Sequence, residues 1–440
     1  MLPRICFPLV LVAILCHLCG LCGLCGGEAQ GPTSNEALAL AMINLHRADT
    51  WQGNFAVKQS VRAGAVPGVT SASARRALSS PRSVKPGLIW NPQLAATAKA
   101  LLSTPIPPEK PLEATAAAAT AGYAGEVFGA IGMAPGDLES NYAALFVRRV
   151  GTTTGKDPKP VFAGPGLLAA RWREIGIAVR LGKPAPVLVV VLGVGPPGHM
   201  AGGTAWQDVN RNGQPDAGEL LQGLTVTIAG ASMTTGPGGV WWLPLSGNEA
   251  TEVTLATAES KTKRAIPTGK GDSLIDWRAP IAADIVAADR AIAKAELVVK
   301  AKGVDEAQAE LAAVALGARL WSLDDDRSAR IATMTEPVAG RLQTTIDRCL
   351  EALTEDRTEF KAKVTAAQKP FGTALRDWAR ELDRLYDLRE QLGKIQSAAK
   401  ELRPQQADVL IGQIDKALKQ SGDPAFVSQL RLWRDMAETF

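Results

Sequence analysis

Cysteine and histidine are scarce in this 440-residue chain, which holds 6 cysteines and 3 histidines. Beyond residue 29 the sequence contains one cysteine, Cys349, so that part of the chain cannot close an internal disulfide. Its stability must therefore come from the burial of apolar side chains. The histidines in the same part are His46 and His199, which are too few for a three-histidine metal centre within one chain.

An excess of charge of one sign is also missing. The 48 basic and 44 acidic side chains nearly cancel, so the chain lacks the strong field that draws proteins to nucleic acid or to an anionic membrane. Beyond the N-terminus no apolar run reaches the roughly 18 residues that cross a bilayer. We therefore expect no nucleic-acid partner, and no transmembrane segment once the N-terminal segment described next has been removed.

The N-terminus does carry a long apolar run, which follows Arg4 and ends in small residues. The small-x-small sequence Gly27-Glu28-Ala29 suits a cleavage site, and we predict that residues 1–29 are a secretory signal. The C-x2-C spacing in this run also resembles a series of metal or cluster ligands. Lipidation of one cysteine is a further alternative, although its last three cysteines each follow a leucine where a lipoprotein signal has Gly, Ala or Ser. A signal would place the protein outside the cytoplasm, as a secreted, periplasmic or cell-surface protein.

The remaining chain predicts a multidomain α+β protein with three parts. Residues 36–195 mix helical and strand patterns. Residues 202–278 consist of short β-like pieces between Gly, Pro and Asn turns, which predict a small antiparallel β-sandwich. Residues 280–440 predict a C-terminal helical bundle, whose apolar seam suggests contact with a protein or cell-envelope partner.

Local signals in the first part predict a helix, a loop and a pair of strands. Asn35 is positioned to cap the helix, and its apolar face is expected to carry Leu38, Met42 and Leu45. Residues 48–86 are rich in Gly, Ser, Pro and Arg and predict a long exposed loop. Two Val- and Ile-rich pieces joined by a Gly-Lys-Pro turn, within REIGIAVRLGKPAPVLVVVLG, predict paired strands.

Two further signals lie in the third part. Asp423 followed by Pro424 predicts the start of a last helix. An apolar seam with spacings typical of a short coiled coil is formed by Leu375, Trp378, Leu382, Leu385 and Leu392.

Four fragments of the first part resemble, in the right order, the signatures of the CAP superfamily of cysteine-rich secretory, antigen-5 and pathogenesis-related proteins. They are MINLHRA, LIWNPQLAATAKAL, GYAGEVFG and LLAARWREIGIAV, and the resemblance covers residues 36–195. It implies an α-β-α sandwich and secretion. The family's cleft usually holds two histidines and two acidic residues that can bind a divalent ion.

The resemblance implies that this cleft has lost most of its functional residues. Leu101 stands where the helix after Trp-Asn-Pro usually offers a histidine, and residues 162–166 replace the segment with the second one. Val190 occupies the position of a polar glutamine, whereas Glu126 matches the family's Gly-Glu motif. We therefore expect a CAP-like scaffold without its metal chemistry.

Glu126 and the two histidines can each be interpreted as structural or as functional residues. Glu126 in a Gly-rich turn suits a cap or loop-bracing acceptor, and the alternative is a hydrolase that acts through a cleft around it. His46 is predicted to be a surface or cap-stabilising side chain of the first helix, and His199 to be solvated in a linker. A lipid or small-ligand carrier is another alternative, since some CAP proteins bind sterols.

The strongest local motif is DVNRNGQPDAGE, which has the oxygen-ligand spacing of a twelve-residue calcium loop. Gly213 allows the sharp turn at position 6, and Glu219 closes the loop at position 12 as a bidentate ligand. The spacing predicts calcium ligands at Asp208, Asn210, Asn212, Gln214 through its carbonyl, Asp216 and Glu219. An Asx-rich turn that satisfies its own backbone is the alternative, but it does not explain Glu219 at position 12.

The flanks of the loop decide which module it belongs to. GGTAW before it and GLTVTIAG after it predict strands, whereas an EF-hand has helices on both sides. With the turn TTGPGGVWW, this pattern resembles the B-type repeats of bacterial SD-repeat surface adhesins, which are small prealbumin-like sandwiches. We expect an exported, non-enzymatic binding or structural protein in which calcium stiffens a β-sandwich spacer.

Overall fold

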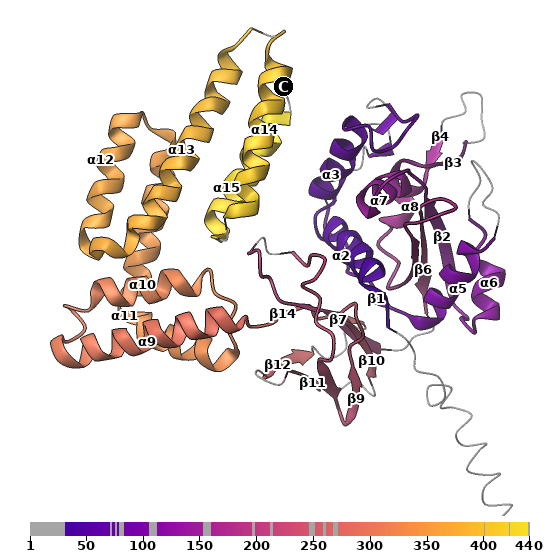
Figure 1. The fold of residues 1–440 in the computed structure, drawn as a ribbon, viewed down its shortest axis with the longest axis horizontal. Helices are drawn as coiled ribbons and strands as arrows, with labels where there is room; N and C mark the ends of the chain where they lie inside the picture. The colour runs from indigo at the N-terminus through magenta and orange to yellow at the C-terminus, as the bar shows by residue number, and fades with distance from the viewer. Residues whose placement is uncertain are drawn as a thin grey trace, which may run out of the picture. The chain divides into compact units, whose positions relative to one another are not determined.

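The computed structural model describes residues 31–440, apart from 71–72, 75–76, 79–82, 105–111, 153–159, 196–198, 212–213, 246–250, 258–260, 267–271, 400, 422 and 439–440. The predicted signal therefore lies outside the described residues. The chain divides into two compact units, which are Met1–Met200 with Thr235–Trp242 and Ala201–Thr234 with Leu243–Phe440 (Figure 1). The coarse prediction of a mixed α/β chain with small antiparallel sheets and a helical C-terminal region is confirmed.

The first unit is built around a four-stranded sheet with the order β1-β5-β6-β2. The strands are β1 (Ile89–Trp90), β2 (Glu126–Gly132), β5 (Glu174–Arg180) and β6 (Val187–Val194). β5 and β6 form the predicted antiparallel pair, and β1 lies parallel to β5. A separate two-stranded sheet joins β3 (Arg149–Thr152) to β4 (Pro160–Phe162).

Helices pack on this sheet because successive side chains of its strands point to opposite faces. Val187, Val189 and Val191 of β6 join a core cluster with Leu94 and Ala98 of α5. α2 contacts β5, and α7 contacts β2 and β6 (Figure 1). The helices of this unit are α2 (Ser34–Ala48), α3 (Thr50–Arg62), α5 (Pro92–Leu102), α6 (Thr115–Thr120), α7 (Leu138–Val147) and α8 (Ala163–Leu167).

The predicted cap of the first helix is wrong, and of its predicted apolar face Leu38 and Met42 are half-buried, whereas Leu45 is exposed. Thr33, rather than Asn35, caps α2: its hydroxyl accepts a hydrogen bond from Glu36 N, and its own N–H donates to Glu36 Oε2 at 2.9 Å. This capping box starts the helix one residue before Asn35. The face that packs inward carries Ala37, Leu40 and Ile43, and Leu45 is 42% exposed.

The prediction of a loop over residues 48–86 is wrong in its first third, where α3 lies. Val57 and Val61 lie four residues apart on one side of α3, and both are buried. Their burial in the unit's core supplies the stability that the polar composition of this stretch does not indicate.

The β segment after residue 198 forms two small sheets. In the first sheet β7 lies between β10 and β13, and β14 also pairs with β7; both β13 and β14 run parallel to β7. The second sheet has the order β12-β11-β8-β9 and is antiparallel throughout. Ala229 and Gly230, both with positive φ, form the two-residue turn between β8 and β9, as expected of a tight hairpin. The strands are β7 (His199–Trp206), β8 (Thr225–Ile228), β9 (Ala231–Thr234), β10 (Val240–Leu245), β11 (Thr251–Ala256), β12 (Lys261–Ile266), β13 (Ser273–Leu274) and β14 (Trp277–Arg278).

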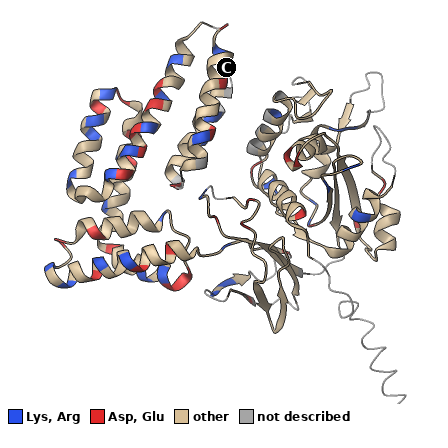
Figure 2. Cartoon of the chain, in the orientation of Figure 1, with Lys and Arg blue, Asp and Glu red and all other residues tan. Residues whose placement is uncertain are grey.

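The rest of the second unit is helical. Its elements are α9 (Ala282–Lys302), α10 (Gln308–Ala318), α11 (Asp325–Glu351), η2 (Ala352–Thr354), α12 (Arg357–Gln368), η3 (Lys369–Leu375), α13 (Arg376–Ser397), α14 (Arg403–Gln420) and α15 (Pro424–Glu438). All five residues of the predicted seam are buried in its core. Within the described ranges, no helix has the combination of length and apolar character that a membrane crossing requires. Side chains of both charge signs are interspersed along α9 to α15 (Figure 2).

Asp423 joins three helices of this region. Its side chain accepts a hydrogen bond from Ala425 N at the start of α15, as the Asp-Pro signal predicts. Both its oxygens pair with the guanidinium of Arg319, at 2.9 and 3.1 Å, and the indole N–H of Trp378 donates to Oδ2 at 3.2 Å. α15 therefore starts at a buried carboxylate that is also held from the end of α10 and from α13.

Candidate functional site

The predicted calcium loop lies between β7 and β8 and is closed at its base by backbone hydrogen bonds. Trp206 and Leu220 form an antiparallel bridge, and Gln207 N donates to Glu219 O at 2.8 Å. These bonds bring the two ends of the loop together, as a twelve-residue ligand loop requires. Asn212 and the turn glycine, Gly213, lie outside the described residues.

Glu219 organises the interior of the loop. Its Oε1 accepts a hydrogen bond from Asn210 N at 3.0 Å, and its Oε2 accepts one from Asp216 N at 3.3 Å. The side-chain amide of Asn210 also donates to Asp216 Oδ2 at 2.6 Å. The structure thus brings together three of the predicted ligand residues, from positions 3, 9 and 12 of the loop. Gln214 is exposed.

Asp208, at the first position of the loop, has a different partner. Its carboxylate is completely buried, and its Oδ2 lies 2.9 Å from Nη2 of Arg278. Arg278 is far away in the sequence, but β14 pairs with β7 so that Arg278 lies opposite Trp206, two residues before Asp208. No spacing rule for calcium loops would have identified Arg278, because strand pairing alone places it there.

A second arginine attaches the loop to the helices that follow. Arg211 has a left-handed backbone, with φ of 62°, and its guanidinium lies 2.6 Å from Asp284 in the first turn of α9. Asp284 is buried and also accepts a hydrogen bond from Ser322 N at 2.9 Å. Gln207 adds a side-chain hydrogen bond to Pro280 O at 2.7 Å.

The chemistry of this loop suits a hard cation. Its candidate donors are all oxygens, which calcium prefers, and three of its side chains are carboxylates. With Arg278 as the neighbouring cation, three negative charges and one positive charge leave a formal charge of −2. Among the described residues no three His, Cys, Asp or Glu side chains converge as a metal site. The carboxylates instead face amide groups and Arg278, and they would have to turn from these partners to hold an ion.

The residues that the CAP resemblance singles out do not form a polar cleft. Leu101 is buried in the apolar cluster under α5, and Val190 is fully buried in β6. Residues 162–166 span the end of β4 and most of α8. Glu126 begins β2, with a side chain that is 54% exposed and an ion pair of 2.9 Å to the exposed Arg171. Such surface pairs contribute little to stability.

His46 is buried, so its predicted surface position is wrong. Only 1% of it is exposed, and its ring stacks on Phe146 with centroids 4.2 Å apart. Nε2 lies 3.0 Å from Asn54 Oδ1, and Nδ1 lies 2.7 Å from the Tyr142 hydroxyl. Since Asn54 Oδ1 can only accept, Nε2 carries the proton and Nδ1 accepts from Tyr142. Burial lowers the pKa of His46 to about 4. The other histidine, His199, does not lie in a linker but begins β7.

Arg47, next to His46, is buried against backbone carbonyls. Its guanidinium donates to Pro86 O at 2.8 Å and to Leu167 O at 2.8 Å, with longer bonds to Ala169 O and Trp172 O. Burial lowers the pKa of Arg47 to about 10. The side chain therefore organises two loop segments, and nothing in its contacts resembles a catalytic arrangement.

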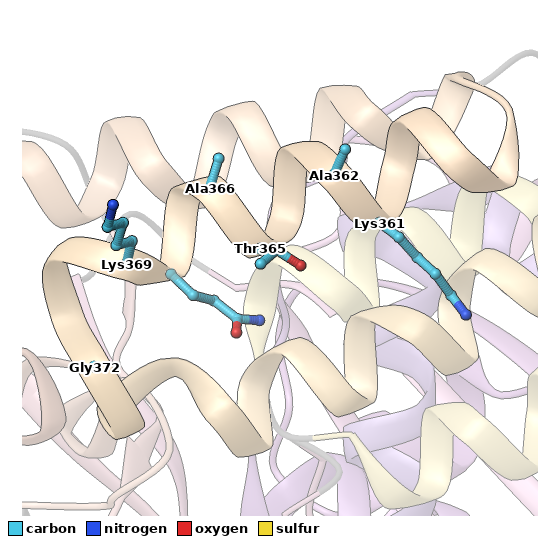
Figure 3. Close-up of a pocket in the computed structure, with 7 residues that line it drawn as sticks. Lys361, Ala362, Thr365, Ala366, Lys369 and Gly372 are labelled. Carbon is cyan, nitrogen blue, oxygen red and sulfur yellow. The ribbon is translucent and has the colours of Figure 1, made fainter.

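Surface hollows lie along the helices of the second unit. One, of about 670 Å³, is lined by Ala362, Thr365 and Ala366 of α12, with Lys361 and Lys369 at its two ends (Figure 3). An adjoining hollow of about 250 Å³ adds Arg376 and Arg380 from α13. A third, of about 390 Å³, lies between α10 and α11 and is mostly apolar.

Comparison with known proteins identifies no relative. No family model, no curated protein and no solved structure matches this chain. The resemblances to CAP proteins and to SD-repeat modules therefore rest on the quoted sequence fragments, and both stay predictions. The division into three domains also stays a prediction.

Proposed function

We propose that this chain is an exported, non-enzymatic binding or structural protein with a calcium-stabilised β segment. In this proposal residues 36–195 form a CAP-like domain without the family's metal chemistry, residues 202–278 form a spacer stiffened by calcium, and residues 280–440 contact a protein or cell-envelope partner. The observation that carries the proposal is that three predicted ligand residues are in contact: the backbone N–H groups of Asn210 and Asp216 donate to the Glu219 carboxylate, and the Asn210 amide donates to Asp216 Oδ2.

The loop geometry supports calcium as the ligand. The carboxylate of Glu219 at position 12 lies beside positions 3 and 9, because it accepts hydrogen bonds from their backbone N–H groups. A calcium loop needs its closing bidentate carboxylate close to the other ligand positions, and this arrangement supports that role. When bound, calcium would supply positive charge that holds Asp208, Asp216 and Glu219 together, and it would thereby stabilise the loop.

The first unit supports a non-enzymatic role. Leu101 and Val190, where the family would carry polar residues, are buried among apolar side chains. The remaining candidate, Glu126, is exposed and paired with Arg171, whereas a catalytic carboxylate is expected in a cleft. Its exposure argues against the hydrolase alternative.

The helical region supports the proposed partner contact in a general way. Lys361 and Lys369 flank the hollow on α12, and Val286 and Leu297 are exposed apolar side chains of α9. Exposed apolar side chains such as these suit contact with a protein partner.

Calorimetric titration of metal-stripped protein with calcium tests the proposal. We expect one binding event per chain, with an affinity on the order of 0.1–1 mM, as in extracellular calcium modules. Glu219→Gln should abolish it, because the amide lacks the bidentate negative ligand. The matched control is Glu306→Gln, which removes an exposed carboxylate from the turn between α9 and α10 and should leave binding unchanged. An absence of heat up to about 10 mM calcium would contradict the proposal.

A further inference from the structure

Arg278 is the feature of this loop that the calcium motif does not explain. Asp208 is completely buried, and a buried carboxylate is stable only when a cation or hydrogen-bond donors compensate its charge. The guanidinium of Arg278 lies 2.9 Å from Asp208 Oδ2. A positive side chain thus faces the carboxylate with which a calcium loop begins.

The pairing of Arg278 with Asp208 is incomplete. An arginine can offer two parallel N–H groups to a carboxylate, as Arg319 does to Asp423. Arg278 makes its contact with Asp208 through Nη2, and within the described residues its buried Nε finds no hydrogen-bond partner. The side chain is 34% exposed, so water is accessible to it without unfolding of the segment.

The second arginine at this loop, Arg211, pairs with a carboxylate that is not a predicted ligand. Arg211 pairs with Asp284 in α9 at 2.6 Å. Its ion pair can persist whether or not a metal is bound, because Asp284 is not a member of the ligand set. Of these two guanidinium groups, therefore, only that of Arg278 competes for a ligand carboxylate.

We infer that Arg278 is a tethered cation that compensates Asp208 in the metal-free loop, and that calcium displaces it. This inference rests on the proposed calcium site and concerns its regulation. Asp208 must offer an oxygen to the ion, and a divalent ion repels a guanidinium a few ångströms away. Calcium binding therefore includes the loss of the Arg278–Asp208 pair, and Arg278 sets the concentration at which calcium binds.

Displacement of Arg278 would also change the junction between the β segment and α9. Arg278 is the last residue of β14, and the next residue donates its N–H to Trp206 O at 2.8 Å. In the metal-free state the Arg278–Asp208 ion pair adds a side-chain contact between β14 and the loop after β7. In the calcium-bound state backbone hydrogen bonds alone hold β14 to β7, and the bound ion stabilises the loop.

The test is a calcium titration of the full chain and three variants, with affinities measured by competition with a chelator. Arg278→Gln removes the competing charge and should bind calcium at least about tenfold more tightly than the parent chain. Arg278→Lys keeps a cation, and Arg264→Gln removes an arginine whose partner is Asp325, outside the loop. Both should bind calcium within about twofold of the parent.

Thermal melts give a second readout. Without metal, Arg278→Gln should lower the melting temperature of the second unit by about 2–4 °C, because Asp208 loses its compensating charge. At saturating calcium the difference should disappear. If the variant does not fold without metal, it is purified in calcium and its affinity is taken from calcium release to the chelator.

The outcomes separate the inference from the proposed site. Equal or weaker calcium binding by Arg278→Gln, with binding by the parent chain, would overturn the role of Arg278 and leave the calcium site standing. If Arg264→Gln also bound calcium more tightly, the change in affinity would reflect the net charge of the protein. That result would also overturn the specific role of Arg278. Binding by none of the four proteins would overturn the site and the inference together.

Discussion

Protonation of His46 should make the first unit less stable in mild acid. The folded protein holds this imidazole neutral, with Nε2 donating to Asn54 and Nδ1 accepting from Tyr142. In the unfolded chain the imidazole is exposed and has a pKa near its usual value of about 6.5, whereas burial lowers the pKa to about 4 in the folded protein. Above pH 6.5 neither the folded nor the unfolded state binds the proton, so protonation of His46 takes nothing from the free energy of unfolding. As the pH falls from 6.5 towards 4, the unfolded chain takes up a proton that the folded protein refuses, and stability is lost.

The size of the loss follows from the difference between the two pKa values. Each pKa unit corresponds to about 1.4 kcal/mol, so the whole interval corresponds to about 3 kcal/mol. At pH 4.5, where part of the folded protein is also protonated, about 2.5 kcal/mol should be lost. Carboxylates elsewhere in the chain titrate in the same range, so a variant is needed to isolate this contribution.

Calorimetric melts of the full chain and of His46→Gln, at pH 7.5 and 4.5, provide the measurement. At pH 7.5 the variant loses the hydrogen bonds of the imidazole and its stacking on Phe146. The melting transition that shifts therefore identifies the unfolding of the first unit. At pH 4.5 the parent loses about 2.5 kcal/mol that the variant cannot lose, so the gap between them should shrink by that amount. An identical gap at both pH values would refute the reasoning, because it would mean that the imidazole takes up its proton equally in both states.

Two further variants test buried charges in the two units. Arg47→Met should destabilise the first unit by about 3 kcal/mol or more in urea unfolding, because several buried carbonyls lose their donor. A loss below about 1 kcal/mol would mean that water replaces the guanidinium. Asp423→Ala should cost the second unit about 3 kcal/mol, since it removes a cap and leaves Arg319 without its carboxylate partner. The double variant with Arg319→Met should be less destabilised than the sum of the two single changes predicts, and strict additivity would show that the pair is not coupled.

The parts of the fold that were predicted correctly are those with a local periodic signal. Leu375 and Leu382 repeat on one helix face, and that face is buried, because the period of the helix decides which side chains meet. The Asp423-Pro424 signal also identified the start of α15, since capping depends on a few neighbouring residues. β5 and β6 were recognisable from their valine and isoleucine content and from the turn between them.

The wrong predictions concern residues whose environment comes from distant segments. His46 is polar and lies beside an arginine, so the local sequence favours the surface, but Tyr142 and Phe146 of α7 enclose it. Arg47 is likewise satisfied by carbonyls more than 100 residues away. The same distinction holds for the candidate loop. Glu219 and Asp216 could be predicted from their spacing, whereas Arg278 reaches Asp208 only through the pairing of β14 with β7.

The buried carboxylate of Asp284 limits how far the β segment can be treated as a transplantable cassette. Arg211 of the loop and Ser322 N, in the segment before α11, both donate to it, so the loop, α9 and this segment meet at one carboxylate. Moving residues 202–278 into another protein would separate Arg211 from Asp284 and the side chain of Gln207 from Pro280 O. A graft that keeps the conformation of the loop would therefore have to include the chain through Ser322, with α9 as part of its frame.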